Sequence, residues 1–432
     1  MLTNFTSLRK LELFYCELYG EFPIERFFKL KMLNNLGLSG NKLSLLPGIS
    51  SSNETLPPIQ NLGLRSCNLH GEIPSWIMNL TDLAYLDLEY NNLQGQIPHS
   101  LFRLVNLEVL SLSFNSLQGQ IELNMFLRLK RLTWLDLSRT NCLCSIKEIL
   151  IPIGEIPSWI MNLTSLHFLN LQQTNLRVFT LENLTFLSLD NNELEGRLDL
   201  DMLLNLKMLS FLGLSYNKLT LFPGEDSKIV THPPLEVLPL ASCNLVEFPP
   251  FIQELDQLGS VDVGNNDIKS ISSWMWRKRN LQSLFAYGNS LTGRISPLIC
   301  NLKSLVILDF SYNNLSGVIP SCLGSFSQSL QALVLQGNKL VGPIPQTYMA
   351  GSNLKMIDFS NNTLKDNRIN DCFPYWLSTL PELKVIALRS NEFHGAIMCP
   401  TRCTFLKLHI IDLSHNEFSR NLAPEMIRNW NP

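Results

Sequence analysis

Apolar and polar residues follow a repeating order along this chain, and residues 305–320, LVILDFSYNNLSGVIP, form one complete unit of it. Leu308 and Phe310 alternate with polar residues, which predicts a short β-strand with one buried face. Leu315 lies beyond that strand, so it must line the inside of a coil that turns back on itself. Asn313 stands where the chain leaves the strand, and its amide can pair with backbone groups of the turn.

Seventeen segments match the strand of this unit, and their central apolar residues are mostly 23 to 26 positions apart. These anchor residues are Leu11, Leu36, Leu62, Leu86, Leu110, Leu135, Leu169, Leu187, Leu212, Leu238, Val261, Leu284, Leu308, Leu333, Ile357, Ile386 and Ile411. One unit cannot bury its own apolar face, whereas stacked copies can. We therefore predict a solenoid with a continuous parallel β-sheet along its inner face, built as a single domain over residues 1–432.

The residue five positions after the anchor is the turn position, and it is Asn in twelve units. These residues are Asn41, Asn91, Asn115, Asn192, Asn217, Asn266, Asn289, Asn313, Asn338, Asn362, Asn391 and Asn416. We expect them to form a structural ladder whose amides pair with the backbone of the turns. Cys16, Cys67 and Cys243 hold the same position in three other units and are predicted to be buried thiols.

Three stretches, 138–160, 172–186 and 360–382, depart from the regular spacing. The first contains an insertion, and residues 154–164 then repeat residues 71–81 without a change, which indicates a duplicated junction. The second stretch is long enough for a strand but too short for a full outer connection. In the third, two turn signals stand so close together that the outer half of one unit and the strand of the next must be missing.

The units share the pattern LxxLxLxxNxLxGxIP, as in residues 83–98 and 330–345. This pattern resembles the plant-specific class of extracellular leucine-rich repeats. Residues 296–324, 367–397 and 406–424 are similar to successive blocks of plant receptor-like proteins, which are extracellular, kinase-less proteins of the disease-resistance type. The resemblance implies an α/β solenoid: a leucine-rich-repeat superhelix, or horseshoe, with a parallel inner β-sheet and about 17 repeats of the LxGxIP type.

For function, the resemblance implies recognition of a peptide, glycan or protein ligand at the cell surface. Members of the family lie on the extracellular side of the plasma membrane and take part in defence or developmental signalling through co-receptor kinases. The sequence shows no N-terminal cap, island, transmembrane or kinase domain, so we expect an interior fragment of such an ectodomain. Two alternatives stay open: a secreted inhibitor of a pathogen wall-degrading enzyme, and a truncated gene product without function.

Composition narrows the possible partners. The net charge is -3 and charged residues make up 16% of the chain, which predicts no general attraction to nucleic acid and no membrane contact. No stretch approaches the roughly 18 uninterrupted apolar residues of a transmembrane helix. The sequence contains no phosphate-cradling glycine-rich loop and no HExxH or GxSxG motif. We therefore expect no enzyme activity, no cofactor and no metal site.

Seven Asn-x-Ser/Thr sequons fit a secreted glycoprotein, although an Asn-rich repeat also creates such sequons by chance. The candidate glycosylation sites are Asn4, Asn53, Asn79, Asn162, Asn183, Asn314 and Asn361. Cys300 and Cys322 follow the proline positions of neighbouring units, so they are the candidate disulfide pair. Free thiols are the alternative.

Aromatic residues gather at two exposed positions of the predicted strands, which are the positions where solenoids meet their ligands. The pre-anchor position holds Tyr85, Trp134, Phe168, Phe186 and Phe211, and the position before the turn holds Tyr15, Tyr90, Phe114, Tyr216 and Tyr312. Arg139 and Arg389 can add contacts to carboxylates. For the pre-anchor residues, packing between neighbouring strands is the alternative interpretation.

Two further clusters resemble binding or catalytic sites, but their place in the repeat accounts for both. Residues 274–279, WMWRKR, mimic an aromatic and basic nucleic-acid patch, but they lie on the outer connection of one unit. One solvent-facing strand position holds a column of acids, which we interpret as a solvated stripe rather than a calcium or acid–base site. The column consists of Asp87, Asp136, Asp262, Asp309, Asp358 and Asp412.

Overall fold

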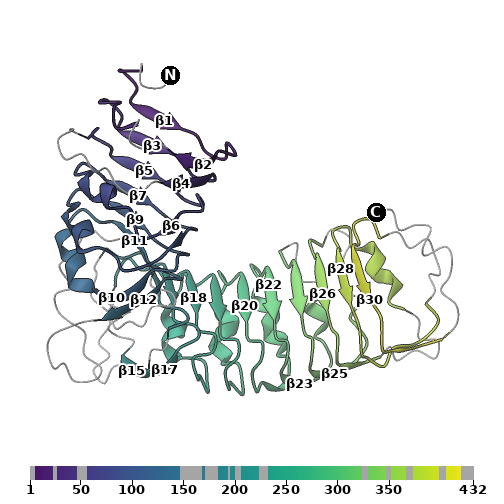
Figure 1. Ribbon diagram of the computed structural model, residues 1–432. Coiled ribbons are helices and arrows are strands. Elements are labelled where there is room, and N and C mark those ends of the chain that lie inside the picture. Colours follow the sequence, from purple (N-terminus) through teal and green to yellow (C-terminus); the bar gives the residue numbers. More distant parts are fainter. Residues whose placement is uncertain are drawn as a thin grey trace. The chain divides into compact units, whose positions relative to one another are not determined.

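The computed structural model describes residues 5–22, 27–45, 56–145, 168–170, 183–192, 195–199, 206–222, 232–323, 329–346, 352–365, 373–397 and 405–419. The chain divides into two compact units, Met1–Pro234 (unit 1) and Leu235–Pro432 (unit 2). Each unit is a coil whose strands stack side by side (Figure 1). The interpretation of residues 1–432 as a single domain stays a prediction.

Within the described part of unit 1, nine short strands form a parallel inner sheet in chain order. They are β1 (Lys10–Glu12), β3 (Asn35–Gly37), β5 (Asn61–Gly63), β7 (Tyr85–Asp87), β9 (Val109–Ser111), β11 (Trp134–Asp136), β13 (Phe168–Asn170), β14 (Phe186–Ser188) and β16 (Phe211–Gly213). The register pairs each anchor with the next, for example Leu62 with Leu86.

Unit 2 repeats this arrangement, with eight inner strands in its described residues. They are β18 (Val237–Pro239), β19 (Ser260–Asp262), β20 (Ser283–Phe285), β22 (Ile307–Asp309), β24 (Ala332–Val334), β26 (Met356–Asp358), β28 (Val385–Ala387) and β30 (Ile410–Asp412). Every predicted anchor lies at the centre of one of the inner strands. The predicted leucine-rich-repeat solenoid with parallel inner strands is confirmed.

The ladder of anchors continues across the irregular stretches. Leu169 pairs with Leu135 on one side and with Leu187 on the other, and Ile357 pairs with Ile386. The unequal lengths are therefore taken up outside the inner strands. Most of these three stretches, including the copied residues 154–164, lies outside the described residues.

Short strands and 3₁₀ helices make up the described return paths. The side strands of unit 1 are β2 (Tyr19–Phe22), β4 (Lys42–Leu45), β6 (His70–Gly71), β8 (Asn92–Leu93), β10 (Gln118–Glu122), β12 (Asn141–Ser145), β15 (Glu195–Asp199) and β17 (Lys218–Phe222). Those of unit 2 are β21 (Thr292–Arg294), β23 (Asn314–Gly317), β25 (Lys339–Gly342), β27 (Thr363–Leu364), β29 (His394–Gly395) and β31 (Glu417–Phe418). The 3₁₀ helices are η2 (Ser75–Asn79), η3 (His99–Arg103), η4 (Leu123–Arg128), η6 (Pro250–Glu254), η7 (Ser273–Arg277), η8 (Pro297–Asn301), η9 (Ser321–Leu323) and η10 (Tyr375–Thr379).

Glycine in the LxGxIP pattern permits close passage of these side strands. Gly317 has a φ of +77°, which L side chains rarely adopt. A Cβ atom at this position would lie 2.9 Å from Cγ of Arg294 on the neighbouring strand. Gly317 is thus required both for its backbone conformation and for space, whereas a Cβ atom at Gly293 would meet nothing within 4 Å.

The core of each unit consists of the anchors and the apolar residues two positions later. Leu86, Leu88 and Leu308 are 0% exposed, and Phe310 is 1% exposed. Full burial of one such side chain stabilises a fold by about 1.5–3 kcal/mol. Residues before and after each anchor face the opposite side of the strand, so they form the inner surface.

The asparagine ladder joins successive repeats through hydrogen bonds. Nδ2 of Asn91 donates to the carbonyl of Leu88 in its own repeat at 2.9 Å and to that of Leu64 in the preceding repeat at 2.8 Å. Oδ1 of Asn91 accepts from the backbone N–H groups of Cys67 and Leu69 at 2.9 and 3.0 Å. One amide therefore satisfies backbone groups of two repeats, whereas the sequence predicted only a local turn.

Candidate ligand-binding surface

The residue before each turn position is held in one backbone conformation. Tyr90, Phe114, Tyr216 and Tyr312 have φ values of 54°, 52°, 58° and 52°, in the left-handed region that bulky residues rarely adopt. The asparagine that follows fixes this turn, because its amide bonds to the carbonyl three residues earlier. The rings are consequently set in place by the backbone of the solenoid.

Four of these inner-surface side chains in unit 1 form a continuous stack, which we name the aromatic–arginine stack: Arg65, Tyr90, Phe114 and Arg139. The Tyr90 and Phe114 rings lie 4.1 Å apart with an interplanar angle of 15°. Cζ of Arg65 lies 4.9 Å from the centre of the Tyr90 ring, and Cζ of Arg139 lies 4.9 Å from that of Phe114. Each guanidinium thus caps one face of the aromatic pair.

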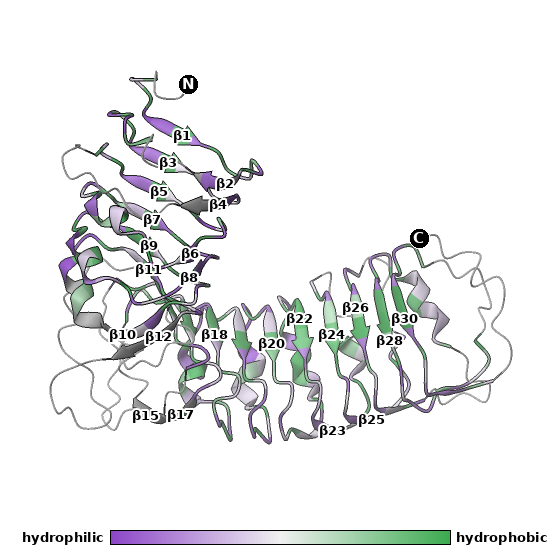
Figure 2. Cartoon of the chain, in the orientation of Figure 1, coloured by the Kyte–Doolittle hydropathy of each residue, from purple (hydrophilic) through white to green (hydrophobic). Residues whose placement is uncertain are grey.

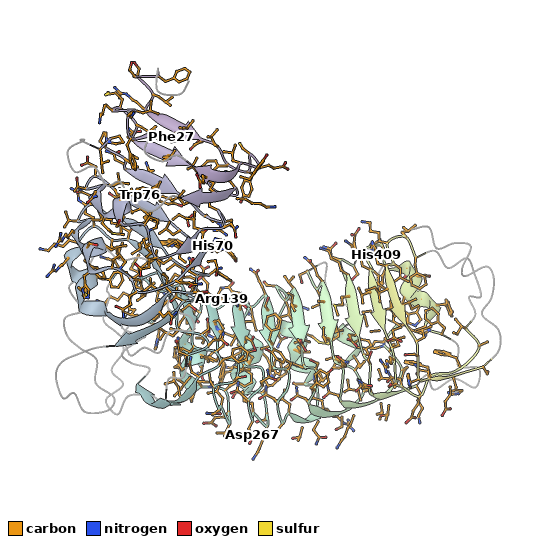
Figure 3. All side chains as sticks on the ribbon, in the orientation of Figure 1. Phe27, His70, Trp76, Arg139, Asp267 and His409 are labelled. Carbon is orange, nitrogen blue, oxygen red and sulfur yellow. A yellow bond between two sulfur atoms is a disulfide. The ribbon has the colours of Figure 1, made fainter. Side chains whose placement is uncertain are left out.

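The stack is accessible to a ligand. Tyr90 is 43% exposed, Arg139 is exposed, and Phe114 is half-buried. Figure 3 labels Arg139, which follows β11. Arg65 is also held by an ion pair, because its Nη1 lies 2.5 Å from Oε2 of Glu89. Arg139 makes no ion pair in the described part of the chain, so its charge remains available.

An acidic cluster of Asp87, Glu89 and Asp136 lies on the strands beside the stack. Oδ1 of Asp87 accepts from the backbone N–H of Glu89 at 3.0 Å, and Oδ2 accepts from the Tyr85 hydroxyl at 3.3 Å. Burial raises the pKa of all three carboxyls, while the Arg65 charge opposes that rise at Asp87 and Glu89. Burial, with the nearby Asp87 charge, raises the pKa of Tyr85 to about 12.

Of the pre-anchor aromatic residues, some pack and some remain exposed. Phe186 and Phe211 stack on each other at 4.2 Å and 12°, and both are half-buried. Tyr85 and Trp134 are 36% and 41% exposed. In this column, Phe186 and Phe211 therefore pack between neighbouring strands, whereas Tyr85 and Trp134 remain accessible to a ligand. The side chain of Phe168 lies outside the described residues.

Comparisons with known proteins support the repeat assignment. Residues 57–117 match the family model "Leucine rich repeat", and residues 280–302 and 304–326 match the model "Leucine Rich Repeat". The chain is 30% identical over 253 residues to Receptor-like protein 32 of Arabidopsis thaliana, covering 47% of this chain and 29% of that protein. It is 33% identical over 344 residues to Receptor like protein 27 of the same plant, covering 58% of this chain and 42% of that protein. The chain is a leucine-rich-repeat solenoid that is similar to plant receptor-like proteins.

This receptor-like chain spans less than half the length of those two relatives. Among solved structures, it is similar to the ectodomain of the Arabidopsis receptor kinase GASSHO1/SCHENGEN3 in complex with CASPARIAN STRIP INTEGRITY FACTOR 2, with a TM-score of 0.65, 25% identity, and coverage of 96% of this chain and 54% of that chain. It is also similar to the Arabidopsis receptor kinase HAESA in complex with the peptide hormone IDA and the co-receptor SERK1, with a TM-score of 0.54, 26% identity, and coverage of 97% and 84%.

The receptor-like chain does not gather all of its predicted site residues in one place. Tyr85, Tyr90, Phe114, Trp134 and Arg139 belong to three neighbouring repeats of unit 1, around β7, β9 and β11. Tyr216 is 48% exposed beside β16 of the same unit. Tyr312, which is 57% exposed, and Arg389, which is exposed, belong to unit 2.

Sequence reasoning missed Arg65 and Glu89, which complete the stack and the acidic cluster. Both stand three positions after their anchors, on the inner face but outside the two columns that were searched. Arg65 is 25 positions from Tyr90 in the chain. The position three residues after the anchor is also on the inner face. Charged residues there, beside aromatic residues of the next repeat, are the sequence signal for such a stack.

The interpretation of the acid column as a solvated stripe is wrong for Asp87, which is only 8% exposed. The other five members are half-buried and keep part of their surface in solvent: Asp136, Asp262, Asp309, Asp358 and Asp412. Every member accepts a hydrogen bond from the backbone N–H two residues later, at 2.8 to 3.0 Å. The carboxylates recur because they pair with strand-end backbone. In the described residues, no group of His, Cys, Asp or Glu could hold a metal ion.

The prediction of buried thiols holds for Cys67 and Cys243 but is wrong for Cys16, which is exposed. Cys16 belongs to the repeat of β1, and in the described residues β1 pairs on one side only, with β3. No neighbouring repeat therefore covers it on the other side. Burial raises the pKa of the Cys67 thiol to about 11.

The aromatic and basic segment 274–279 lies only partly at the surface, where Arg277 and Arg279 are exposed. Met275 and Trp276 are buried, and Lys278 is only 7% exposed. Nζ of Lys278 donates to the carbonyls of Gln253 and Leu255, each at 2.8 Å. Lys278 therefore binds backbone carbonyls at the end of η6. Because it is buried there, its charge is not at the surface.

Further predicted groups lie at the edges of the repeats. Cys300 and Cys322 form a disulfide with a Cα–Cα distance of 6.0 Å. The sequon residues Asn79, Asn183, Asn314 and Asn361 are exposed, whereas Asn4, Asn53 and Asn162 lie outside the described residues. Among the described residues, no helix is long and apolar enough to cross a membrane.

Proposed function

We propose that this chain is a ligand-recognition segment of a plant cell-surface receptor and binds an extended peptide across the inner face of unit 1. The aromatic–arginine stack carries the proposal. Its rings are half-exposed, fixed by left-handed backbone and clamped by guanidinium groups. A ligand would contact them without ordering them first, so little conformational entropy is lost on binding. Tyrosine and arginine are also the residue types that dominate binding energy at interfaces.

The exposed charge of Arg139 supports a peptide rather than an apolar ligand. Its guanidinium attracts the carboxylates that a peptide carries, whereas Asp87 and Glu89 already pair within the chain. HAESA, which has a similar fold, was solved with a peptide hormone and a co-receptor. By analogy, we infer an extracellular location and signalling through partner kinases, in defence or in development.

A random dodecapeptide library displayed on phage tests the proposal. The library is selected on the purified chain, and the enriched peptides are measured against the double variant Tyr90→Ala/Phe114→Ala. Loss of two aromatic contact residues is expected to weaken binding by about 30-fold or more, since even one such residue commonly contributes about 2 kcal/mol.

Tyr19→Ala is the matched control. Tyr19 is 86% exposed in unit 1 but lies on the side strand β2, away from the inner face. Its loss is expected to leave binding within twofold of the unmodified chain. Enriched peptides that bind the double variant as tightly as the unmodified chain would overturn the proposal, provided that circular dichroism shows both to be folded.

A further inference from the structure

A row of apolar side chains crosses the inner face of unit 2. It consists of the pre-anchor residues of β22, β24, β26, β28 and β30, which the register places side by side: Ile307, Ala332, Met356, Val385 and Ile410. Ile410 is 56% exposed and the other four are half-buried. Strands β22, β28 and β30 are mainly green in Figure 2, whereas β1 and β5 are mainly purple. This apolar row is part of the surface and not of the core.

Acidic residues border the apolar row on every second strand. Two positions further along the same strands, on the same face, stand Asp309, Val334, Asp358, Ala387 and Asp412. The backbone N–H groups of Ser311, Ser360 and Ser414 hold Oδ1 of the three aspartates at 2.9, 3.0 and 3.0 Å. In the described part of the chain, their Oδ2 atoms have no hydrogen-bond partner. Hydrogen bonds from Ser414 lower the pKa of Asp412, so it remains ionised.

The other side of the apolar row is basic. Lys355 and Lys384 stand one residue before Met356 and Val385, and both are exposed. His409 holds the same position before Ile410. Figure 3 labels His409, which directly precedes β30. The face therefore has a direction, because a bound cation is attracted to the aspartate side and repelled from the lysine side. On the aspartate side, the exposed Arg389 and His415 stand near Asp412.

The spacing of the aspartates selects a conformation for the occupant. Neighbouring strands lie about 4.8 Å apart, so aspartates on every second strand are about 9.6 Å apart. A polyproline II helix advances about 9.3 Å in one turn of three residues. Cationic residues at every third position of such a peptide would each meet one aspartate, while a second residue of each turn faces the apolar row.

We propose that the inner face of β22 to β30 binds a peptide segment in the polyproline II conformation that carries one apolar residue and one arginine or lysine in every three residues. The apolar row supplies contact area, and the aspartates fix the register and orientation. This surface goes beyond the proposed function, because it shares no residue with the aromatic–arginine stack of unit 1. The two proposals therefore stand or fall separately.

A fluorescent dodecapeptide made of four Pro-Leu-Arg triplets is the probe, measured by fluorescence polarisation at low salt. Two peptides serve as comparisons: one of the same composition with its four arginines placed together, and one of four Pro-Leu-Glu triplets. The triplet arginine peptide is expected to bind at least tenfold more tightly than either comparison. Raised salt is expected to weaken its binding, since the pairs are exposed.

Charge-neutralising variants locate the contact. The triple variant Asp309→Asn, Asp358→Asn and Asp412→Asn keeps an oxygen for each backbone N–H, so folding is preserved. It is expected to weaken binding by about tenfold or more, because each exposed ion pair contributes a factor of up to about five. Met356→Glu, which places a charge in the apolar row, is expected to weaken it by a similar factor.

A second triple variant removes the same charge elsewhere in unit 2: Glu247→Gln, Asp256→Asn and Asp267→Asn. These residues are exposed and lie on the outer connections or at the turns. Binding is expected to stay within twofold. Equal weakening by both triple variants, or equal binding of the clustered-arginine peptide, would overturn the proposal. Concentration-dependent dimerisation that Met356→Glu abolishes would instead assign the face to a second copy of the chain and would also overturn it.

Discussion

At the scale of single residues, the asparagine ladder explains why one side chain recurs at the turn position. Nδ2 of Asn115 donates to the carbonyls of Leu88, Leu112 and Ser113 at 2.9, 3.0 and 3.1 Å, and its Oδ1 accepts from the N–H of Leu93 at 3.0 Å. Asn is the small side chain that offers both two donors and one acceptor. Where Thr140 takes this position, its hydroxyl donates only to Leu137, at 2.8 Å.

We predict that Asn115→Ala lowers the free energy of unfolding by about 2–4 kcal/mol, because buried carbonyl and N–H groups of two repeats lose their partners. Urea denaturation followed by circular dichroism measures the change. Asn106→Ala is the control, since Asn106 donates one exposed hydrogen bond, to Thr81, at 3.1 Å. Equal effects of the two substitutions would contradict the role assigned to the ladder.

A second prediction at this scale concerns pH. Burial raises the pKa of Asp136 above its ordinary value of 3.8, so between these two values the folded chain binds more protons than the unfolded chain. The contribution of Asp136 to stability therefore falls as pH rises through this window. Asp136→Asn keeps the acceptor for Ser138 and removes that dependence.

The stability of Asp136→Asn relative to the unmodified chain is expected to be greater at about pH 7 than at about pH 3, as measured by urea midpoints at these two values of pH. Asp412→Asn should show the opposite sign, because hydrogen bonds from Ser414 lower the pKa of Asp412 and its stabilising effect is lost as pH falls. The same pH trend in both variants would refute the assignment.

At the scale of elements, the 3₁₀ helices show how the outer connections are tied together. Residues Ser273–Arg277 form η7, and Lys278 directly after it reaches back to the end of η6 (Pro250–Glu254). Burial lowers the pKa of Lys278, while Asp256 and Glu254 oppose that effect. The lysine thus pairs with backbone carbonyls at the end of that helix, where the carbonyl of Leu255 also accepts from the N–H of Leu258 at 3.3 Å.

Replacement of Lys278 by methionine is expected to destabilise the chain by about 1–3 kcal/mol, because the two charge-assisted hydrogen bonds to the carbonyls of Gln253 and Leu255 are lost. Thermal unfolding followed by circular dichroism measures the effect. Lys269→Met, at an exposed position of the same unit, is expected to change the midpoint by less than the error of the measurement. A more stable Lys278→Met variant would show that the cost of burying the charge exceeds the value of its bonds.

At the scale of the whole molecule, stability depends on neighbouring repeats. Leu110 and Leu308, on strands with partners on both sides, are 0% exposed. Leu11 on β1 and Ile411 on β30 are half-buried, because in the described residues each of these strands pairs on one side only. In such quasi-one-dimensional folds, the outermost repeats lose the stabilising contribution of one neighbour.

Hydrogen exchange in the 432-residue chain should therefore be fastest at the two outer strands. The amides of β1 and β30 are expected to exchange at least tenfold faster than those of β9 and β22, since they open without disrupting two interfaces. Mass spectrometry of peptic fragments resolves these segments. Uniform protection across all four strands would contradict a nearest-neighbour account.

Much of the fold could be predicted from the sequence, because the repeat constrains it strongly. Each anchor leucine must face inward, and a shift of one residue would turn every anchor outward, so the period determines the register. For the candidate surface, the sequence predicted which positions carry aromatic residues. It did not predict which of these side chains pack on each other and which bond to polar groups. Phe186 and Phe211 share a column with Tyr85, yet they stack on each other while Tyr85 bonds to Asp87.

The sequence by itself determined the period, the strand centres and the turn residues, since these depend on contacts within one repeat. Only the tertiary structure decided which groups meet across repeats. Arg65 reaches the ring of Tyr90, and Asn91 reaches the carbonyl of Leu64, although about a full repeat separates the partners in the chain. Residues so far apart become neighbours only when parallel strands pair about 4.8 Å apart, and side-chain packing then decides which of them touch.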